Sequence, residues 1–336
     1  MSPSKGKTLL AGDIGGTKTL LRLARVEGDG VRTLCQQRFA SAGFPRFDAL
    51  LSRFLSDCGV AEVHTACLAV AGPVESAQDH QTARVTNLPW RLDSGEYARR
   101  FAIPRFCLIN DFAAVAYGID MLDEEMLCTL QEGRRRPGAP VLVAGAGTGF
   151  GVALRITSRE ADESYEKILP SEAGHGDFAP ASPLLAELAR FLREKQGRCA
   201  VEDVLSGAGL ENIHAFLRRQ EGGPMPEAKP ETAPAISEAA QHGDPLACRT
   251  LDLFCAAYGA TVGNLALCSL PRGGVYIAGG IAPRVIRFLQ AGEFIAAFRD
   301  KGKMSALMET FPVAVIMNPE VGLLGAQRCA ERLVSG

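Results

Sequence analysis

The chain carries little excess charge of either sign, because 36 Lys and Arg residues are balanced by 38 Asp and Glu residues, for a net charge of −2. No segment has a basic stripe, and the short run 134–136 beside Pro137 is typical of a solvated turn. Proteins that bind nucleic acid usually depend on clustered positive charge. We therefore expect no nucleic acid among the partners of this chain.

Long uninterrupted hydrophobic runs are also missing. The opening residues, MSPSKGK, lack the apolar stretch of a signal peptide. The longest apolar stretches, around 141–154 and 254–270, are broken by glycines, and we expect them to be too short to span a bilayer. The sequence thus predicts a cytoplasmic protein with no membrane partner.

The ten cysteines form no recognisable metal-binding pattern. No C-x-x-C pair occurs, and no cluster of Cys and His has zinc spacing. Most of them lie inside apolar runs, which is typical of buried small hydrophobic side chains in a reducing compartment. We therefore expect thiols that serve only to pack the core.

Two widespread nucleotide-binding patterns are missing as well. No G-x-x-x-x-G-K-[ST] segment occurs, which removes the main support for a P-loop. The glycine-rich run that begins at Gly145 does not complete G-x-G-x-x-G, because Phe150 and Val152 stand where a third glycine is needed. A nucleotide would have to be held by a different arrangement of glycines.

The order of elements present indicates an α/β protein. Helical stretches are predicted at 47–58, 112–122, 184–196 and 246–266. Strand-like runs are predicted at 9–12, 20–26, 65–71, 106–110, 141–145, 152–156, 275–279 and 313–317. At 336 residues the chain exceeds what one hydrophobic core usually serves, so two domains that share a cleft are expected.

A glycine-rich hairpin near the N-terminus is the most informative segment. Two strand-like runs flank the turn Gly12-Asp13-Ile14-Gly15-Gly16-Thr17. Glycines let backbone N–H groups approach phosphate oxygens, Thr17 can donate a hydrogen bond, and Asp13 can hold Mg²⁺ through its waters. The segment predicts a phosphate cradle, with an ordinary hairpin and a turn-favouring Asp as the alternative.

Two further glycine-rich turns stand at the ends of strand-like runs. The stretch 141–154 repeats the strand, turn and strand of the first hairpin, with Gly147 and Thr148 in its turn. The pair Gly279-Gly280 ends a buried run and could lie flat against an adenine or a ribose, although a structural turn is the alternative. Three such turns together favour two similar halves that face one nucleotide.

Polar residues that could contact a ligand occur in three places. Asp111 follows a buried strand-like run and begins a helical pattern, so it fits either a ligand site at a strand's carboxyl end or a helix cap. Glu172 and His175 could pair with hydroxyls; a helical metal pair is disfavoured by the neighbouring glycines, and a structural histidine is the alternative. Glu202 could complete the set, or lie in a solvated first helical turn.

These segments occur in the order found in bacterial glucokinases of the actin/hexokinase superfamily, in the family without a zinc motif. The chain resembles that family from about residue 9 to 325. The matching segments are Gly12 to Thr17, Thr86-Asn87-Leu88-Pro89-Trp90, Leu108-Ile109-Asn110-Asp111-Phe112, Gly145 to Gly149, Glu172 to Pro180, Glu202 to Gly207 and Ala278 to Arg284.

The resemblance implies two ribonuclease-H-like, actin-like ATPase domains that flank a cleft, each with a mixed sheet and helices. Residues 1–111 with about 313–336 would form a small domain, and residues 112–312 a large one. The activity implied is ATP-dependent phosphorylation of D-glucose to glucose 6-phosphate for glycolysis, with ATP and Mg²⁺ as cofactors. We also expect a homodimer.

The resemblance also implies roles for single residues. Asp111 would be the general base. The hexose would be contacted by Asn110, Asp111, Glu172, His175 and Glu202. The nucleotide would be held by Gly12, Asp13, Ile14, Gly15, Gly16, Thr17, Gly147, Thr148, Gly279 and Gly280, with Asp13 facing Mg²⁺ through water.

Rival functions lack the features that they need. A sugar-responsive repressor would carry a helix-turn-helix before the first strand, and only about eight residues precede it here. An actin-type filament or chaperone would need neither Asn110 with Asp111 nor Glu172 with His175. A hexose or N-acetylhexosamine kinase with a zinc motif would have cysteines after His175, and residues 176–180 contain none.

Overall fold

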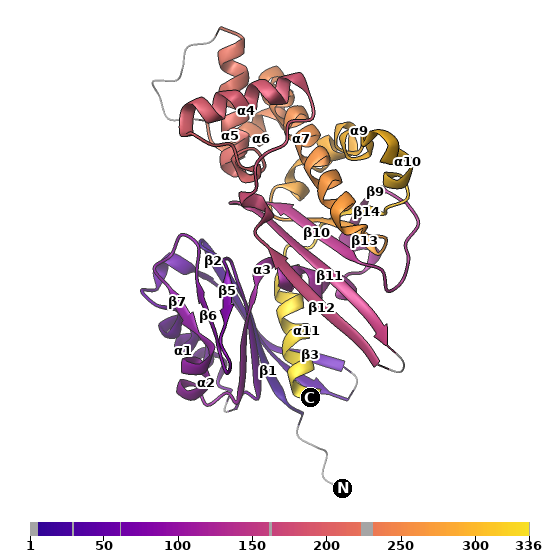
Figure 1. The fold of residues 1–336 in the computed structure, drawn as a ribbon. Coiled ribbons are helices and arrows are strands. Elements are labelled where there is room, and N and C mark those ends of the chain that lie inside the picture. Colours follow the sequence, from indigo (N-terminus) through magenta and orange to yellow (C-terminus); the bar gives the residue numbers. More distant parts are fainter. Residues whose placement is uncertain (1–5, 29, 61, 161–162, 223–230, 336) are drawn as a thin grey trace. The chain divides into compact units, whose positions relative to one another are not determined.

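The computed structural model describes residues 6–28, 30–60, 62–160, 163–222 and 231–335, and it divides the chain into two compact units (Figure 1). The first unit comprises Met1–Leu122 with Glu320–Gly336, and the second comprises Asp123–Pro319. Each unit has its own mixed sheet and its own hydrophobic core. The predicted α/β fold with two similar halves is confirmed.

The first unit is built on a five-stranded sheet in the order β3-β2-β1-β4-β8. Its strands are β1 (Thr8–Ile14), β2 (Lys18–Glu27), β3 (Gly30–Ala40), β4 (Thr65–Val70) and β8 (Arg105–Asn110). A small sheet holds β5 (Val74–Ser76), β6 (Gln81–Arg84) and β7 (Arg91–Asp93). Its helices are η1 (Ser41–Gly43), α1 (Phe47–Cys58), α2 (Ser94–Arg100), α3 (Asp111–Gly118), η2 (Ile119–Met121) and α11 (Val321–Ser335).

The two faces of this sheet are covered by different helices. On one face Leu10 and Leu68 share a core with α1, whereas on the other face Leu9 and Cys67 pack with residues of α11. Strands β1, β4 and β8 are apolar on both sides because both faces are covered. In Figure 1 the C-terminal helix α11 lies along this sheet, far in sequence from the strands that it covers.

The second unit has a six-stranded sheet in the order β12-β11-β10-β13-β14-β9. Its strands are β9 (Leu127–Gln131), β10 (Val141–Ala146), β11 (Phe150–Glu160), β12 (Glu163–Ser171), β13 (Gly274–Ala278) and β14 (Val313–Ile316). Its helices are η3 (Glu124–Met126), η4 (Ala173–His175), α4 (Pro183–Gln196), η5 (Val201–Asp203), α5 (Gly207–Gln220), α6 (Ala233–Gln241), α7 (Pro245–Ser269), η6 (Ala282–Val285), α8 (Ile286–Gln290), α9 (Glu293–Arg299), η7 (Gly302–Met304) and α10 (Ser305–Met308).

The two sheets repeat one pattern. In the first unit β1 is antiparallel to β2 and parallel to β4, and in the second unit β10 is antiparallel to β11 and parallel to β13. Each central strand therefore leads into a hairpin turn at its carboxyl end and has a parallel neighbour that ends at the same edge. This is the arrangement that the two glycine-rich hairpins in the sequence indicate.

The unit boundaries differ from the domain boundaries expected at 111/112 and 312/313. Helix α3 lies in the first unit because it packs closely on α11: a Cβ on Gly325 would lie 1.7 Å from the Ala114 carbonyl oxygen. Strand β14 lies in the second unit because it pairs with β13 and β9. The chain therefore changes units at 122/123 and 319/320 rather than at a strand end.

Helix α7 corrects the expectation about stretch 254–270. It is 25 residues long, and by length and composition alone it could cross a membrane, with a mean hydropathy of 1.4 over its best window. However, 67% of that window is buried inside the unit. Tyr258 accepts a hydrogen bond from the Ala146 amide at 3.1 Å, so α7 packs against β10 as a core helix.

The cysteines also depart from the expectation. Cys35 on β3 and Cys58 at the end of α1 form a disulfide, so these two are not thiols. Cys67, Cys107 and Cys329 come together from three separate elements, which spacing along the sequence does not reveal. The expectation of thiols that pack the core is therefore wrong for Cys35 and Cys58, while Cys67, Cys107 and Cys329 are thiols in the apolar core but are not scattered in space.

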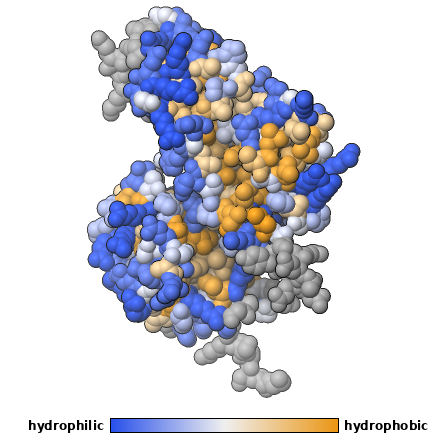
Figure 2. Space-filling view, in the orientation of Figure 1, coloured by the Kyte–Doolittle hydropathy of each residue, from blue (hydrophilic) through white to orange (hydrophobic). Residues whose placement is uncertain are grey.

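Exposed large hydrophobic side chains are few among the described residues. Val31, Ile156, Leu270 and Met304 are the most exposed of them, and they belong to different elements. In Figure 2 hydrophilic residues cover much of the visible face of the first unit. The two cores thus account for most of the apolar side chains.

Candidate active site

The first glycine-rich turn is held rigidly by hydrogen bonds to its carbonyl oxygens. The carbonyl of Gly15 accepts from the Ser41 hydroxyl at 2.8 Å, and the carbonyl of Ile14 accepts from the Ala71 amide at 3.0 Å. Gly16 lies so close to the Thr86 carbonyl that a Cβ would be 2.7 Å from its oxygen. Gly12 to Thr17 therefore form a preorganised turn, as a phosphate cradle requires.

Asp13 lies near the carboxyl end of β1, next to the start of α11. A Cβ on Gly322 would lie 3.4 Å from Asp13 Oδ2, so the carboxylate faces the first turn of that helix. Burial raises the pKa of Asp13 above its ordinary value, and the positive charge of Lys18 opposes this in part. The site thus disfavours an uncompensated carboxylate, which fits a residue that faces a divalent cation.

Asn110 and Asp111 divide two tasks at the carboxyl end of β8. Asn110 Oδ1 accepts hydrogen bonds from the amides of Phe112 and Ala113 at 2.9 and 3.2 Å, so Asn110 is the N-cap of α3. Asp111 is the first residue of the helix, and its Oδ1 also accepts from the Phe112 amide. The sequence left a helix cap as the alternative role of Asp111. In the structure Asn110 is the N-cap instead.

The register of the sheet brings these groups to one edge. Strands β1, β4 and β8 are parallel, with Ile14 opposite Val70 and Val70 opposite Asn110. The hairpin turn after Ile14 and the Asn110-Asp111 pair therefore leave the sheet at the same edge, where open α/β sheets bind ligands. The first unit gathers Asp13, Thr17, Asn110 and Asp111 there.

The second glycine-rich turn lies against Glu202. The Gly147 amide donates to the Gly149 carbonyl at 2.9 Å and closes the turn, and the Gly207 amide donates to the Gly147 carbonyl. A Cβ on Gly149 would lie 2.7 Å from Glu202 Oε2. Sequence reasoning missed this contact, because nothing in the spacing links η5 to the β10–β11 hairpin.

The turn at Gly279 and Gly280 comes to the same end of that sheet. Gly279 has a φ of 86°, and a Cβ there would lie 2.3 Å from the Ala146 carbonyl oxygen, so a side chain is excluded by backbone and space together. A Cβ on Gly280 would meet nothing within 4 Å. Gly279 therefore shapes the turn, while Gly280 presents open backbone, which suits contact with a flat ligand group.

Glu172, His175 and Glu202 form one cluster in the second unit. His175 Nδ1 lies 3.2 Å from Glu202 Oε1, and His175 Nε2 lies 3.8 Å from Glu172 Oε2. The His175 side chain is 63% exposed, so it is not a buried structural histidine. Both carboxylates lie close to the same imidazole. The cluster therefore presents two carboxylates and one imidazole that can hydrogen-bond to hydroxyl groups.

The loop that carries this cluster is braced from behind. Gly174 packs on β11, where a Cβ would lie 2.1 Å from the Phe150 carbonyl oxygen. Arg198 donates to the His175 carbonyl at 2.8 Å and to Asp177 Oδ1 at 2.9 Å. Glu172 and His175 lie around a short 3₁₀ turn and not on one face of an α-helix, in agreement with the sequence argument against a helical metal pair.

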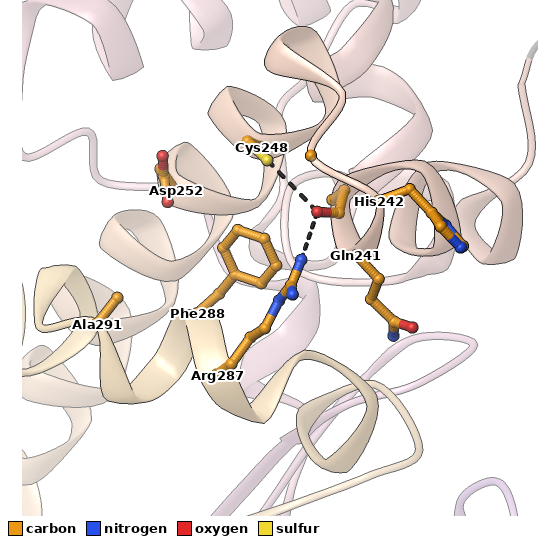
Figure 3. A pocket seen from close by; sticks show the side chains of 9 residues that line it. Gln241, His242, Cys248, Asp252, Arg287, Phe288 and Ala291 are labelled. Carbon is orange, nitrogen blue, oxygen red and sulfur yellow. Dashed lines mark hydrogen bonds between the residues drawn. The ribbon is translucent and has the colours of Figure 1, made fainter.

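A separate pocket of about 480 Å³ lies between α6, α7 and α8 (Figure 3). None of the predicted site residues lines it. Arg287 and the Cys248 thiol both donate to the Ala240 carbonyl, so these two side chains join the three helices around the pocket (Figure 3). We assign this pocket no part in the site.

Comparison with known proteins identifies the family. A family model described as Glucokinase matches residues 10–333. The chain belongs to the glucokinase family. It is 42% identical to the glucokinase of Nostoc punctiforme over 97% of this chain and 99% of that one.

Solved glucokinases share the fold. The structure from an Antarctic psychrotroph is 31% identical, with a TM-score of 0.84 over 97% of this chain and 99% of that one. The glucokinase of Balamuthia mandrillaris in complex with glucose is 24% identical, with a TM-score of 0.80 over 98% and 95% of the two chains. The chain is therefore an enzyme with the actin-like fold of the sugar kinases.

Proposed function

We propose that this chain transfers the γ-phosphoryl group of Mg·ATP to the 6-hydroxyl of D-glucose, and that glucose 6-phosphate then enters glycolysis. Family membership and the Asn110-Asp111 pair carry this proposal. Because Asn110 caps α3, the Asp111 carboxylate is held at the carboxyl edge of the sheet, beside the turn suited to phosphate. A base positioned at that edge is what a sugar kinase needs.

Asp111 would accept the proton of the attacking hydroxyl as the phosphoryl group passes. The transition state of phosphoryl transfer is loose, so orientation and charge neutralisation lower the barrier more than proton removal does. Backbone N–H groups of the turns at Gly15-Gly16 and Gly147-Thr148 would contact phosphate oxygens, and Gly280 would contact the nucleoside. Asp13 would hold a water of Mg²⁺, an ion that neutralises phosphate charge when bound.

Glu172, His175 and Glu202 would read the hydroxyls of the hexose. We place Asn110 in the same set through the second N–H of its amide nitrogen, since its Oδ1 is engaged in the cap and its Nδ2 already donates one hydrogen bond to the Gly72 carbonyl at 3.2 Å. We also propose a cytoplasmic homodimer as the working form, which size-exclusion chromatography with light scattering tests.

The proposed activity is tested by a coupled assay of ADP release with glucose, mannose, galactose and N-acetylglucosamine. We expect turnover with glucose to be the fastest. A folded protein with no glucose-dependent ADP release would refute the proposal, and a preference for N-acetylglucosamine would favour the runner-up, a kinase of amino sugars.

Replacing Asp13 with Asn should increase stability and reduce activity. The folded-state pKa of Asp13 is raised, so its ionised form is penalised by folding at neutral pH, and the amide removes that penalty. We expect a higher melting temperature at pH 7, with the gain shrinking as the pH falls through the folded-state pKa toward the ordinary value of 3.8. Activity should fall about 10- to 100-fold, with a higher Mg²⁺ requirement, because an outer-sphere partner of the ion is lost.

The contrary outcomes for this variant are clear. An unchanged Mg²⁺ requirement with full activity would remove Asp13 from the metal role. A lower melting temperature at pH 7 would show that the carboxylate is stabilised where it lies, against the direction of its pKa shift.

Replacing His175 with Ala, or Glu172 with Gln, should narrow the preference for glucose. The loss of a hydrogen bond between a sugar hydroxyl and a charged group costs about 1.5 to 3 kcal/mol, so kcat/KM for glucose should fall roughly 10- to 100-fold and the advantage over mannose should shrink. The KM for ATP should change little. The matched control is Arg198→Ala. It removes the hydrogen bond to the His175 carbonyl but keeps the Glu172 and His175 side chains that are proposed to contact the sugar.

A purely structural role for this cluster makes the opposite prediction. All three variants would then lower the melting temperature with the ranking of sugars unaltered. Measuring kcat/KM for glucose, mannose and galactose beside each melting curve separates the two cases.

A further inference from the structure

Three cysteines from separate elements come together in the first unit. Cys67 on β4 and Cys107 on β8 are register partners in neighbouring parallel strands, and Cys329 on α11 packs against the same face. Their three sulfur atoms all lie within 4.8 Å of one another, and Sγ of Cys107 is 3.9 Å from Sγ of Cys329. Within the part of the chain that the structure describes, no other group of three or more Cys, His, Asp or Glu residues meets so closely.

The spacing of the sulfurs is that of ligands around one ion. A Zn–S bond is about 2.3 Å long, so two thiolates at a tetrahedral angle stand about 3.8 Å apart. The Cys107–Cys329 distance has this value already, and Cys67 needs at most a small rotamer adjustment to match it. A disulfide would instead require one pair to close to about 2.05 Å and would leave the third sulfur unused.

The surroundings of the cluster select the kind of ion. The side chains that enclose it are apolar, among them Ala69, Ala330 and Ile109, and all three ligand atoms are sulfur. Soft thiolate ligands favour soft cations over Mg²⁺ or Ca²⁺. Cys67 is fully buried, whereas Cys107 and Cys329 are partly exposed, so an ion can enter from solvent and keep one water ligand.

Charge favours a divalent ion over a monovalent one. Three thiolates around a divalent cation carry one net negative charge, and around a monovalent cation they carry two. Arg332, one turn further along α11, brings a positive charge close to Cys329 and can offset a single negative charge. A second uncompensated charge in this apolar setting would be costly.

We propose that Cys67, Cys107 and Cys329 form a three-thiolate site for a soft divalent d¹⁰ cation, Zn²⁺ or its analogue Cd²⁺, with water as the fourth ligand. The bound ion would join α11 to β4 and β8 and so fasten the C-terminal helix to the strand that ends at Asn110. Binding to the folded state alone would stabilise the first unit.

The test uses the intact chain, reduced with a phosphine and freed of metal by a chelator, and then titrated with Cd²⁺. We expect one Cd²⁺ per chain and a thiolate-to-metal charge-transfer band in the ultraviolet. Zn²⁺ should raise the melting midpoint reported by the fluorescence of Trp90, the single tryptophan, which is buried in the first unit. Cys329→Ser should weaken Cd²⁺ binding at least about 100-fold and abolish the Zn²⁺ effect on melting.

Two controls make the result specific. The double variant Cys35→Ser with Cys58→Ser should keep the site, because that pair lies elsewhere, and Cys268→Ser should keep it as an exposed thiol of the second unit. If Cys329→Ser fails to fold, Cys107→Ser on the edge strand provides the same test. Unchanged Cd²⁺ binding in the Cys329 or Cys107 variant, loss of it in the Cys35/Cys58 variant, or a Cys107–Cys329 disulfide in protein isolated without oxygen would overturn the proposal.

Discussion

Replacing Asp111 with Asn is expected to lower kcat by about 100-fold or more, with a much smaller change in the affinity for glucose. The amide has the size of the carboxylate and can still hydrogen-bond to the sugar, but it cannot accept the proton. Because Asn110 supplies the N-cap of α3, the helix should keep its start in the variant. Pre-steady-state measurement of ADP formation, beside glucose titration, separates chemistry from binding.

The comparison with Asn110 sharpens this prediction. Asn110→Ala removes two cap hydrogen bonds and should destabilise the first unit by about 1 kcal/mol. Asp111→Asn removes no cap and should change the free energy of unfolding by only a few tenths of a kcal/mol, through a small helix-dipole effect. Near-normal turnover in Asp111→Asn would show that Asp111 is not the base.

Replacing Gly325 with Ala is expected to destabilise the first unit by about 3 kcal/mol. The added Cβ would stand 1.7 Å from the Ala114 carbonyl oxygen and 2.9 Å from the Gly118 amide, both backbone atoms that cannot rotate away. Helix α11 would have to move off α3, the helix that begins at Asp111. Urea denaturation followed by Trp90 fluorescence measures the loss.

Gly43→Ala is the matched control in the same unit, since a Cβ there would meet nothing within 4 Å. It should change the urea midpoint by little. If Gly325→Ala unfolds at the same urea concentration as the original chain, the close packing of α3 on α11 is not what holds that helix in place.

Local patterns in the sequence predicted the helices and strands whose apolar residues recur at a regular spacing. The helical pattern at 47–58 became α1 with the same bounds, and the run at 106–110 became β8. Strand β3 was missed because it lies at the edge of its sheet, where none of its residues is fully buried and its apolar residues recur at no regular interval. A regular spacing of apolar residues reflects burial on one face of an element. An edge strand buries few side chains, so it shows no such spacing.

The same reasoning reached part of the candidate site. Asp13, Asn110 and Asp111 could be placed at strand ends because each directly follows an apolar run. The contact of Glu202 with the turn at Gly149, the position of Gly322 beside Asp13 and the meeting of three cysteines all depend on pairings between distant segments. Such pairings are set by strand order and helix packing, which one sequence does not encode in any local period.

The return of α11 to the first unit has a consequence for synthesis on the ribosome. One face of that unit's sheet, with Leu9, Ala11 and Ala69, is covered by Leu323, Ala326 and Ala330 of the C-terminal helix. During translation this face stays uncovered until residues 321–335 emerge, while the continuous second unit is complete earlier. The nascent first unit therefore exposes an apolar surface for most of its synthesis. A truncation near residue 320 should destabilise the first unit, which is synthesised first, more than the second unit, which is synthesised just before the truncation point.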